Sequence, residues 1–164
     1  MRNATAGALL AILLSACSLH ERYGLRPGAS SAADVQRAMG APGMELRNPD
    51  GSKQLAYTTG PAGTETFMVY LGRDGKLERI EQVLTDDRFN QLRPGTTTRD
   101  QVRAIIGPPH RTMRFDNLGQ DAWEYRFQDA WGYLADFSVM IDDRGIVAGK
   151  AVRRIEGRES SGHR

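Results

Sequence analysis

One residue in this chain has both the type and the position for covalent chemistry. Cys17 is the only cysteine, and it directly follows a short apolar run that closes with Leu14, Ser15 and Ala16. A thiol at the end of such a run would serve as an acylation point. Because a single thiol cannot form a disulfide within its own chain, the folded part is expected to be stabilised by packing alone.

The segment before Cys17 has the layout of an export signal. One positive charge, at Arg2, precedes an apolar run over residues 6–16 that is dominated by Ala, Leu and Ile and ends in small residues. A membrane-spanning helix needs about 20 apolar residues. The chain turns polar from Ser15 onward, which is too early for a permanent membrane span. The segment is therefore expected to be removed as a signal peptide.

The end of this segment resembles the lipobox of bacterial lipoproteins, which reads Leu, then Ser or Ala, then Ala or Gly, then the lipid-bearing Cys. Leu14, Ser15, Ala16 and Cys17 match it position by position. The resemblance implies a mature chain that starts at Cys17 and carries three acyl chains. One chain binds membranes only marginally, at about 0.8 kcal/mol per buried CH₂, so three would make a stable anchor. The alternatives are an ordinary secretory signal with a chance cysteine, or a free core thiol.

The residue after the cysteine carries a further implication of this resemblance. In the lipoprotein sorting of Gram-negative bacteria, a residue other than Asp at that position directs the protein to the outer membrane. Ser18 occupies the position here. The resemblance therefore implies an outer-membrane lipoprotein that faces the periplasm, with the lipid bilayer as a partner through the acylated Cys17.

The other reactive side chains do not form a recognisable catalytic or metal site. His20, His110 and His163 lie far apart, without the spacing of metal ligands or of a catalytic dyad. Acids stand side by side at 86–87 and 142–143, but neighbours in an extended segment point to opposite faces and Asp is a common turn residue. We expect no catalytic residue, no metal and no cofactor. The formal net charge of +2 argues against nucleic acid as a partner.

The chain contains an internal repeat. The tetrapeptide at 25–28, Leu-Arg-Pro-Gly, recurs at 92–95, and Gly40 has its counterpart at Gly107. Self-similarity of this kind is the signature of a repeated structural unit. The expected organisation is a signal peptide over 1–16, a lipidated linker over 17–24, repeats over 25–84 and 92–156, a linker over 85–91 between them, and a disordered tail over 157–164.

Each repeat is predicted to begin with a short helix. Ser31 and Thr98 are suitable N-caps, and Asp34 and Gln101 follow three residues later in a loose capping-box arrangement. Apolar residues that share one helical face come next. They are Val35 and Met39 in the first repeat, and Val102, Ile105 and Ile106 in the second. A glycine then ends each helix, at positions 40 and 107.

Strands are predicted after each helix. Trp123, Tyr125 and Phe127 alternate with polar residues, which is the two-residue period of a half-buried strand. The same pattern recurs over 67–71 and 137–141. Gly-containing turns at 73–75 and 143–145 lead into third strands at about 77–84 and 146–154. We therefore predict an α+β fold of two tandem repeats, each a short helix or helical hairpin packed on a three-stranded antiparallel sheet. Because neither repeat alone buries a large core, the two are expected to pack or pair.

The second repeat resembles the SmpA/OmlA (BamE-like) domain family of outer-membrane lipoproteins. The family's Gly, Thr, Val, Leu-Gly-x-Pro and Trp-x-Tyr signature is kept in the stretches 93–102, 106–109 and 123–125. In the first repeat, Leu-Ala-Tyr at 55–57 stands where Trp-x-Tyr is expected. The family's best-known member is an outer-membrane assembly lipoprotein with a single domain, from which the tandem arrangement departs. Two copies in tandem are similar to the duplicated β-lactamase inhibitor protein fold. The resemblance covers roughly 25–154.

Two segments are candidates for contact with a protein partner. Trp131 and Tyr133 flank a glycine in the connection at 129–133, where exposed aromatics would be good interface anchors. Arg114 and Phe115 lie in a second connection, 110–118, which is expected to be a loop. The alternatives are that the aromatics fold back onto the sheet, that the second connection is only solvated, or that Arg and aromatic side chains contact lipid headgroups.

The resulting functional prediction is a lipid-anchored outer-membrane protein that faces the periplasm and acts as a non-catalytic protein-binding module. The family resemblance implies outer-membrane protein assembly or envelope integrity, with a partner in the outer membrane or periplasm that could belong to the assembly machinery. One alternative is a periplasmic inhibitor or ligand-sensing module of the β-lactamase inhibitor protein-like fold. Another is a purely structural envelope protein.

Overall fold

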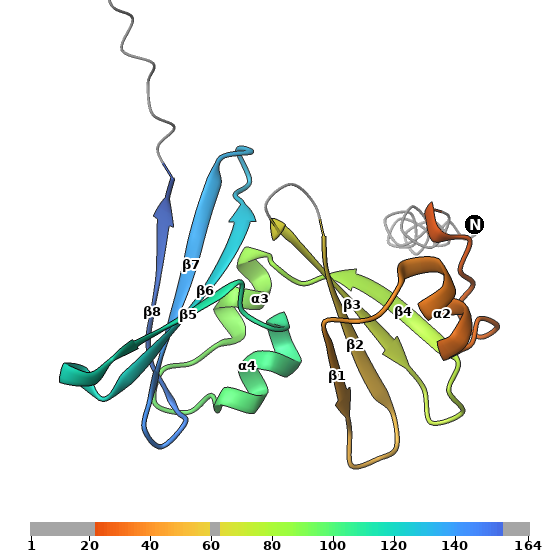
Figure 1. The fold of residues 1–164 in the computed structure, drawn as a ribbon, viewed down its shortest axis with the longest axis horizontal. Coiled ribbons are helices and arrows are strands. Elements are labelled where there is room, and N and C mark those ends of the chain that lie inside the picture. The colour runs from red at the N-terminus through yellow and green to blue at the C-terminus, as the bar shows by residue number, and fades with distance from the viewer. Residues whose placement is uncertain (1–21, 60–62, 156–164) are drawn as a thin grey trace, which may run out of the picture.

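A computed structural model describes residues 22–59 and 63–155 (Figure 1). Cys17, the signal segment and the predicted tail over 157–164 lie outside the described residues. Within those two ranges, no helix combines the length and the apolar character needed to cross a bilayer. The elements are α2 (Ala32–Met39), β1 (Met44–Arg47), β2 (Lys53–Thr59), β3 (Glu65–Leu71), β4 (Leu77–Gln82), α3 (Asp86–Gln91), α4 (Arg99–Ile106), β5 (Arg111–Phe115), the 3₁₀ helix η2 (Asp116–Leu118), β6 (Gln120–Gln128), β7 (Leu134–Asp142) and β8 (Val147–Arg154).

The strands form two separate antiparallel sheets. Their orders are β1-β2-β3-β4 and β5-β6-β7-β8, so each repeat builds its own meander of consecutive strands. The predicted α+β fold of two tandem repeats is therefore confirmed. Each sheet has four strands rather than the predicted three, because β1 and β5 add an edge strand. The alternation in β1, MELR, covers only four residues, and β5, RTMRF, is mostly exposed, so it is pairing with the next strand that defines both.

The helix boundaries follow the predicted capping chemistry in both repeats. The backbone N–H of Asp34 donates to Ser31 Oγ (3.2 Å), and the N–H of Ser31 donates to the Asp34 carboxylate (2.8 Å). Thr98 and Gln101 make the same reciprocal pair at 3.2 and 2.8 Å. These bonds satisfy backbone donors that have no partner inside the helix. The C-terminal glycines are also confirmed, since both adopt a positive φ, 83° at position 40 and 82° at position 107.

The first capping box makes stability depend on pH. The backbone hydrogen bond from Ser31, then its hydroxyl and the Arg37 guanidinium, lower the pKa of Asp34 to about 2. Because this pKa is below its unfolded value of about 3.9, the carboxylate contributes its full stabilisation above that value and loses it as the pH falls through about 2. We expect the melting temperature of D34N to fall less between about pH 5 and about pH 2 than that of the wild type.

The control for this titration is D100N. Asp100 also stands in the first turn of a helix, but its side chain is 91% exposed and the capping box of that helix uses Gln101. Its replacement should leave the acid-induced loss of stability close to that of the wild type. Equal acid sensitivity of D34N and the wild type would contradict the assignment.

Helix α2 packs on one face of the first sheet and closes the first core. Val35 of α2 is fully buried among side chains from β2, β3 and β4. Phe67 and Val69 supply the alternating positions predicted for this strand, and they belong to the same cluster. The first core thus follows from two periodicities in the sequence, one helical and one extended.

Helices α3 and α4 close the second core. Val102 and Ile106 of α4 pack on the face of the second sheet that carries Trp123 and Tyr125. Phe89 of α3 belongs to the same cluster, with its ring stacked on that of Phe137 at 4.0 Å. Residues 85–91, predicted to be a linker, are therefore a helix that is integrated into the second core. The reason is the single large apolar side chain in this polar segment, which buries itself on the sheet.

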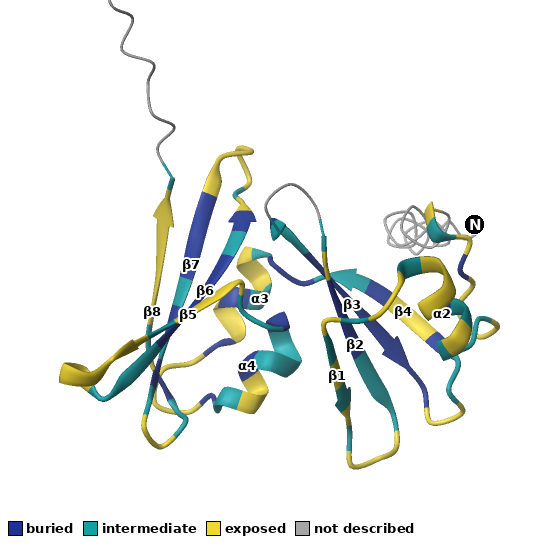
Figure 2. Cartoon of the chain, viewed as in Figure 1, coloured by how far each residue is buried: buried dark blue, intermediate teal, exposed yellow. Residues whose placement is uncertain are grey.

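The two repeats pack against each other through the α3–α4 layer, which lies between the two sheets (Figures 1 and 2). Gly107, at the end of α4, lies on the face of the first sheet opposite to α2. A Cβ built there would lie 2.9 Å from Thr66 Cγ2 and 3.6 Å from Ala56 Cβ. Ala56 and Met68 are fully buried on this face. The expectation that the repeats pack together is thus met by helix-on-sheet packing.

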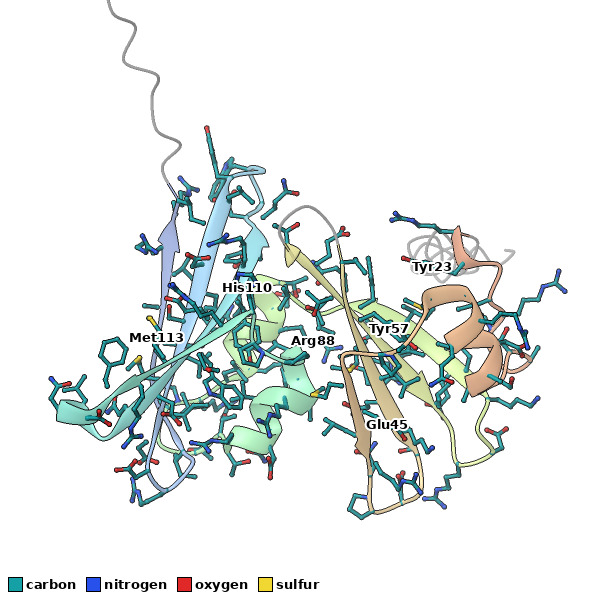
Figure 3. The ribbon with its side chains drawn as sticks, viewed as in Figure 1. Tyr23, Glu45, Tyr57, Arg88, His110 and Met113 are labelled. Carbon is teal, nitrogen blue, oxygen red and sulfur yellow. The ribbon has the colours of Figure 1, made fainter. Side chains whose placement is uncertain are left out.

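An ion pair supplements the apolar contact between the repeats. Arg88 of α3 donates to the Glu81 carboxylate on β4 and lies between the repeats in Figure 3. Glu81 also accepts from Arg79 at 2.8 Å, and the Arg79 guanidinium lies 3.6 Å from the centre of the Tyr70 ring. The Arg88–Glu81 ion pair therefore holds α3 against β4 of the first sheet.

Candidate protein-binding site

The connection between β6 and β7 is a structured hairpin with two exposed aromatic side chains; we call residues 129–133 the aromatic hairpin. One carboxylate oxygen of Asp129 accepts hydrogen bonds from the backbone N–H groups of Trp131 and Tyr133, both at 3.0 Å. The backbone N–H of Asp129 donates to the carbonyl of Tyr133 (2.9 Å). Gly132 supplies the positive φ, 82°, that the turn requires.

Arg154, at the end of β8, fixes the two aromatic side chains. Its Nε donates to the second carboxylate oxygen of Asp129 at 2.7 Å. Its guanidinium lies 4.9 Å from the centre of the Trp131 ring and 5.1 Å from that of Tyr133, which is cation–π distance. The rings are therefore held by one arginine side chain, and they remain largely free to contact a partner.

The charge state of Asp129 keeps this arrangement intact. Burial acts to raise its pKa, but hydrogen bonds from the Tyr133 backbone, from Arg154 and from the Trp131 backbone together outweigh burial and leave the pKa below its ordinary value. The carboxylate is thus ionised throughout the neutral range. It can accept from the turn and from the guanidinium at the same time.

The aromatic hairpin is the most exposed apolar feature among the described residues. Trp131 is 76% exposed and Tyr133 is 58% exposed, so the alternative in which both fold back onto the sheet is not the geometry observed. Val152, two residues before Arg154 on β8, is 54% exposed. Exposed apolar side chains that lie together mark interaction surfaces, and Trp and Tyr are the residue types enriched at binding hot spots.

A shallow hollow of about 230 Å³ lies beside the hairpin, at the junction of the two repeats. Leu84 and Phe127 form its apolar part, while Asp86 and Asp129 give it acidic walls. The remaining lining residues are Gln82, Thr85, Gln128 and Ala130. A hollow next to exposed aromatics offers a place for a side chain of a bound protein.

Arg114 and Phe115 lie at the other end of the second sheet. They are on β5, so the predicted loop over 110–118 is wrong for five of its residues. The ladder pairs Phe115 with Gln120 at the start of β6, whereas Leu134 pairs with Gln128 at its end. The structure therefore does not bring the two predicted contact regions together.

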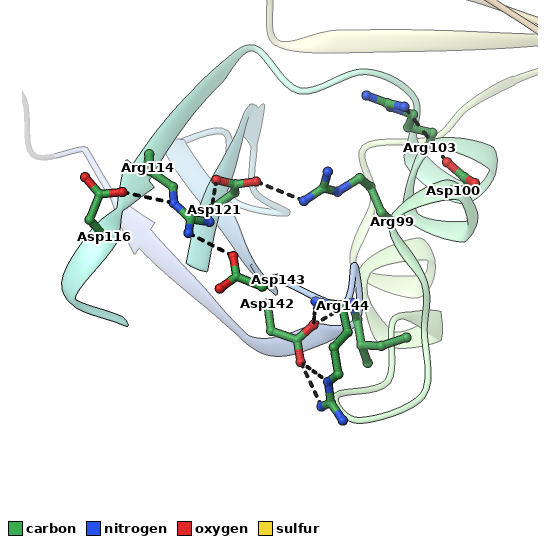
Figure 4. A network of polar contacts seen from close by, with 10 residues as sticks. Arg99, Asp100, Arg103, Arg114, Asp116, Asp121, Asp142, Asp143 and Arg144 are labelled. Carbon is green, nitrogen blue, oxygen red and sulfur yellow. Dashed lines mark hydrogen bonds and ion pairs between the residues drawn. The ribbon is translucent and has the colours of Figure 1, made fainter. Parts of the chain in front are cut away.

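The guanidinium of Arg114 is engaged within the molecule (Figure 4). It donates to Asp143 (2.8 Å), Asp116 (3.2 Å) and Asp121 (3.3 Å), and these hydrogen bonds, that of Asp143 first, raise its pKa above the ordinary arginine value. Asp121 accepts a second bond from Arg99 of α4 (2.9 Å). Arg114 thus connects the β5–β6 end to the β7–β8 turn, and a role for it in partner binding stays a prediction.

Arg154 is the residue of this site that the sequence did not single out. It stands at the end of a strand, 21 positions after Tyr133 in the chain, and only the antiparallel pairing of β7 and β8 brings it to the hairpin. The one available signal was the length of the third predicted strand, which extends to position 154. Cys17, the predicted lipidation site, lies outside the described residues.

Comparison with protein families gives a match over residues 81–148 to the family described as the outer membrane protein assembly factor BamE domain. The matched segment runs from the end of β4 through α3, α4 and the second sheet to the start of β8. The predicted resemblance of the second repeat is thereby confirmed: this part of the chain is similar to the BamE domain. The match includes α3, in agreement with the place of Phe89 in the second core.

Comparisons with solved structures and with curated proteins give no further support for a function. The chain is similar to the crystal structure of a DUF4309 family protein, YjgB, from Bacillus subtilis subsp. subtilis str. 168, at 17% sequence identity, over 80% of this chain and 83% of that one, with a TM-score of 0.32. At that TM-score the likeness carries no conclusion about fold or function. No curated protein matches the chain.

Proposed function

We propose that this protein is a lipoprotein of the outer membrane that faces the periplasm and binds another envelope protein during outer-membrane protein assembly. The BamE domain over 81–148 is the observation that supports the assembly role, since the family is described by that process. The lipid anchor is proposed at Cys17, from the lipobox-like sequence that precedes it. The module is proposed to act by binding, without catalysis.

The aromatic hairpin is the proposed contact surface. Trp131 and Tyr133 expose large rings whose side chains have few rotatable bonds, so they bury much area at small entropic cost. Arg154 and Asp129 hold the rings before the partner arrives, which lowers the ordering cost of binding. The hollow beside the hairpin provides a recess between the two repeats.

Replacing Trp131 by alanine is expected to weaken partner binding by at least about 30-fold, the loss typical of an interface hot spot at about 2 kcal/mol. Because Trp131 is 76% exposed, the melting temperature should change little. The matched control is L118A, at the opposite end of the sheet, where Leu118 is 57% exposed. That variant should bind normally.

The partner can be identified by placing a photoreactive residue at position 131 in living cells. We expect covalent adducts with a component of outer-membrane protein assembly from position 131 and none from position 118. Absence of any envelope-protein adduct, together with normal outer-membrane protein levels in a deletion strain, would refute the proposed role.

A further inference from the structure

The second sheet has a face that no described element covers. The helices α3 and α4 pack on the side that carries Trp123 and Phe137. The opposite side, which we call the outer face, contains two cross-strand rows that carry charge. One row pairs Arg111 with Glu124 and then Ser138, and the next pairs Arg126 with Asp136 and then Arg153.

The same face of the first repeat is already a protein-binding surface within this molecule. Its row of Met44, Ala56 and Met68 is equivalent to Arg111, Glu124 and Ser138, because Met44 and Arg111 each begin an edge strand. The same backbone hydrogen bond precedes both edge strands. The N–H of Gly43, just before β1, donates to the carbonyl of Ala56, and the N–H of His110, just before β5, donates to the carbonyl of Glu124, both at 2.8 Å. On the first sheet, Ala56 and Met68 of this row are fully buried beneath the end of α4, and Met44 is partly buried beside them.

The second sheet has changed the chemistry of this row while keeping its geometry. Arg111, Glu124 and Ser138 stand where the first sheet has apolar side chains. A further helix layer ending like α4 could not bind there, because an apolar helix end would bury the charges without satisfying them. A polar outer face is also what keeps a repeat with an uncovered sheet face soluble. Solubility alone does not require the particular layering of charges seen here.

The carboxylates of the outer face are buried and the guanidiniums lie above them. The side chains of Glu124 and Asp136 are only 12% and 5% exposed, whereas those of Arg111 and Arg153 are 55% and 71% exposed and that of Arg126 is 30% exposed. Arg111 Nε donates to Glu124 at 2.8 Å. Arg126 and Arg153 donate to the two oxygens of Asp136 at 3.1 and 3.3 Å. The surface that a partner meets is therefore basic, although its rows contain both signs of charge.

This layering orients the arginines. Each guanidinium has five N–H donors, and Arg153 uses a single one on Asp136, as Arg126 does. The buried carboxylates restrict the guanidinium positions and leave donors directed outward. Arginine forms planar, two-bonded contacts with carboxylates, and prior orientation reduces the entropy lost in making them.

We propose that the outer face of the second sheet binds an acidic segment of a partner protein, whose carboxylates pair with Arg111, Arg126 and Arg153. The equivalent face of the first repeat supplies the precedent, since its occupant is protein. The exposed arginines supply the charge complementarity. This proposal does not depend on the aromatic hairpin, because Arg154, which holds the aromatic rings, alternates with Arg153 and lies on the other side of the sheet.

The test uses the purified full-length protein and a fluorescent polyglutamate peptide as the probe, with binding followed by anisotropy at low salt. The variant is R111Q/E124Q/R153Q. Glu124 is replaced together with its ion-pair partner Arg111, so that no buried carboxylate is left unpaired, and Asp136 keeps its ion pair with Arg126. We expect it to bind the peptide at least about tenfold more weakly, since hydrogen bonds between charged groups are the strong ones. Near-ultraviolet circular dichroism checks that it is folded.

The matched control is R37Q/R47Q on the first repeat, where both side chains are similarly exposed, 75% and 71%. It should bind the peptide like the wild type, and so should W131A. Equal losses in the two arginine variants would show binding by overall charge and overturn the proposal. Binding to phosphatidylglycerol vesicles with no binding to the peptide would overturn it in favour of a lipid surface. Loss of peptide binding in W131A would move the acidic site to the hairpin, and W131A itself tests the proposed function separately.

Discussion

Gly107→Ala is expected to destabilise the protein more than Gly40→Ala, although the two glycines have the same backbone conformation. Their φ and ψ values are 82° and −165° at position 107, and 83° and −162° at position 40. Alanine in this region costs about 1–3 kcal/mol of strain at either site. At position 107 the new methyl would also lie 2.9 Å from Thr66 Cγ2, whereas at position 40 it would meet nothing within 4 Å. This steric overlap should add about 1–3 kcal/mol.

Urea unfolding of the two variants measures the difference, which reports on the contact between the repeats. A second variant makes the test specific: Thr66→Ser removes the methyl group that collides and keeps the hydroxyl near Thr58 (3.4 Å). In the background of Gly107→Ala it should recover part of the lost stability, as a coupling between the two positions. Equal destabilisation by the two glycine variants, with no recovery, would mean that α4 does not pack on the first sheet as described.

Phe89→Ala is expected to cost about 3–5 kcal/mol in the free energy of unfolding, the usual range for truncating a buried aromatic side chain. Phe89 is 3% exposed, with its ring stacked on Phe137 at 4.0 Å and edge-on to Phe127 at 4.9 Å. The loss would be measured by urea unfolding. Asn90, the next residue of the same helix, is exposed, and Asn90→Ala should change stability by less than about 0.5 kcal/mol.

This comparison decides whether residues 85–91 are a connecting linker or part of the second repeat. A linker would tolerate both substitutions equally, and that result would contradict the placement of α3 in the core. The expected outcome is a large effect for Phe89 and a negligible one for Asn90. The family match, which begins at residue 81, already places α3 inside the matched domain.

The parts of the fold that could be predicted are those with local signals. Capping pairs at Ser31 and Thr98, glycines at positions 40 and 107, and the alternation through Trp123 are each defined by neighbouring residues, and each is found in the structure. The helix α3 was missed because it is only six residues long and has one buried side chain. Strand β5 was missed because its residues are mostly exposed and its conformation is set by pairing with β6.

The candidate site divides in the same way. The local sequence identified Trp131 and Tyr133, because two large aromatic residues flank a glycine between two predicted strands. The two-residue period also placed Arg126 on the face opposite Trp123 and Tyr125. The local sequence could not identify Arg154, Arg153 or Arg111, because their positions depend on the register between β7 and β8 and on the pairing of β5. The outer face is recognised by comparing equivalent rows of side chains in the two sheets. That comparison requires the strand registers of both sheets, which the structure supplies.

The central claim is a binding module held at the outer membrane by a lipid on Cys17. The most direct measurement is the intact mass of the native protein, purified from membranes and compared with a Cys17→Ser variant. We predict a native mass equal to residues 17–164 plus three acyl chains with their glycerol, and a variant that lacks this addition and leaves the membrane fraction or accumulates unprocessed. A native protein that carries no lipid and fractionates with soluble proteins would contradict the account.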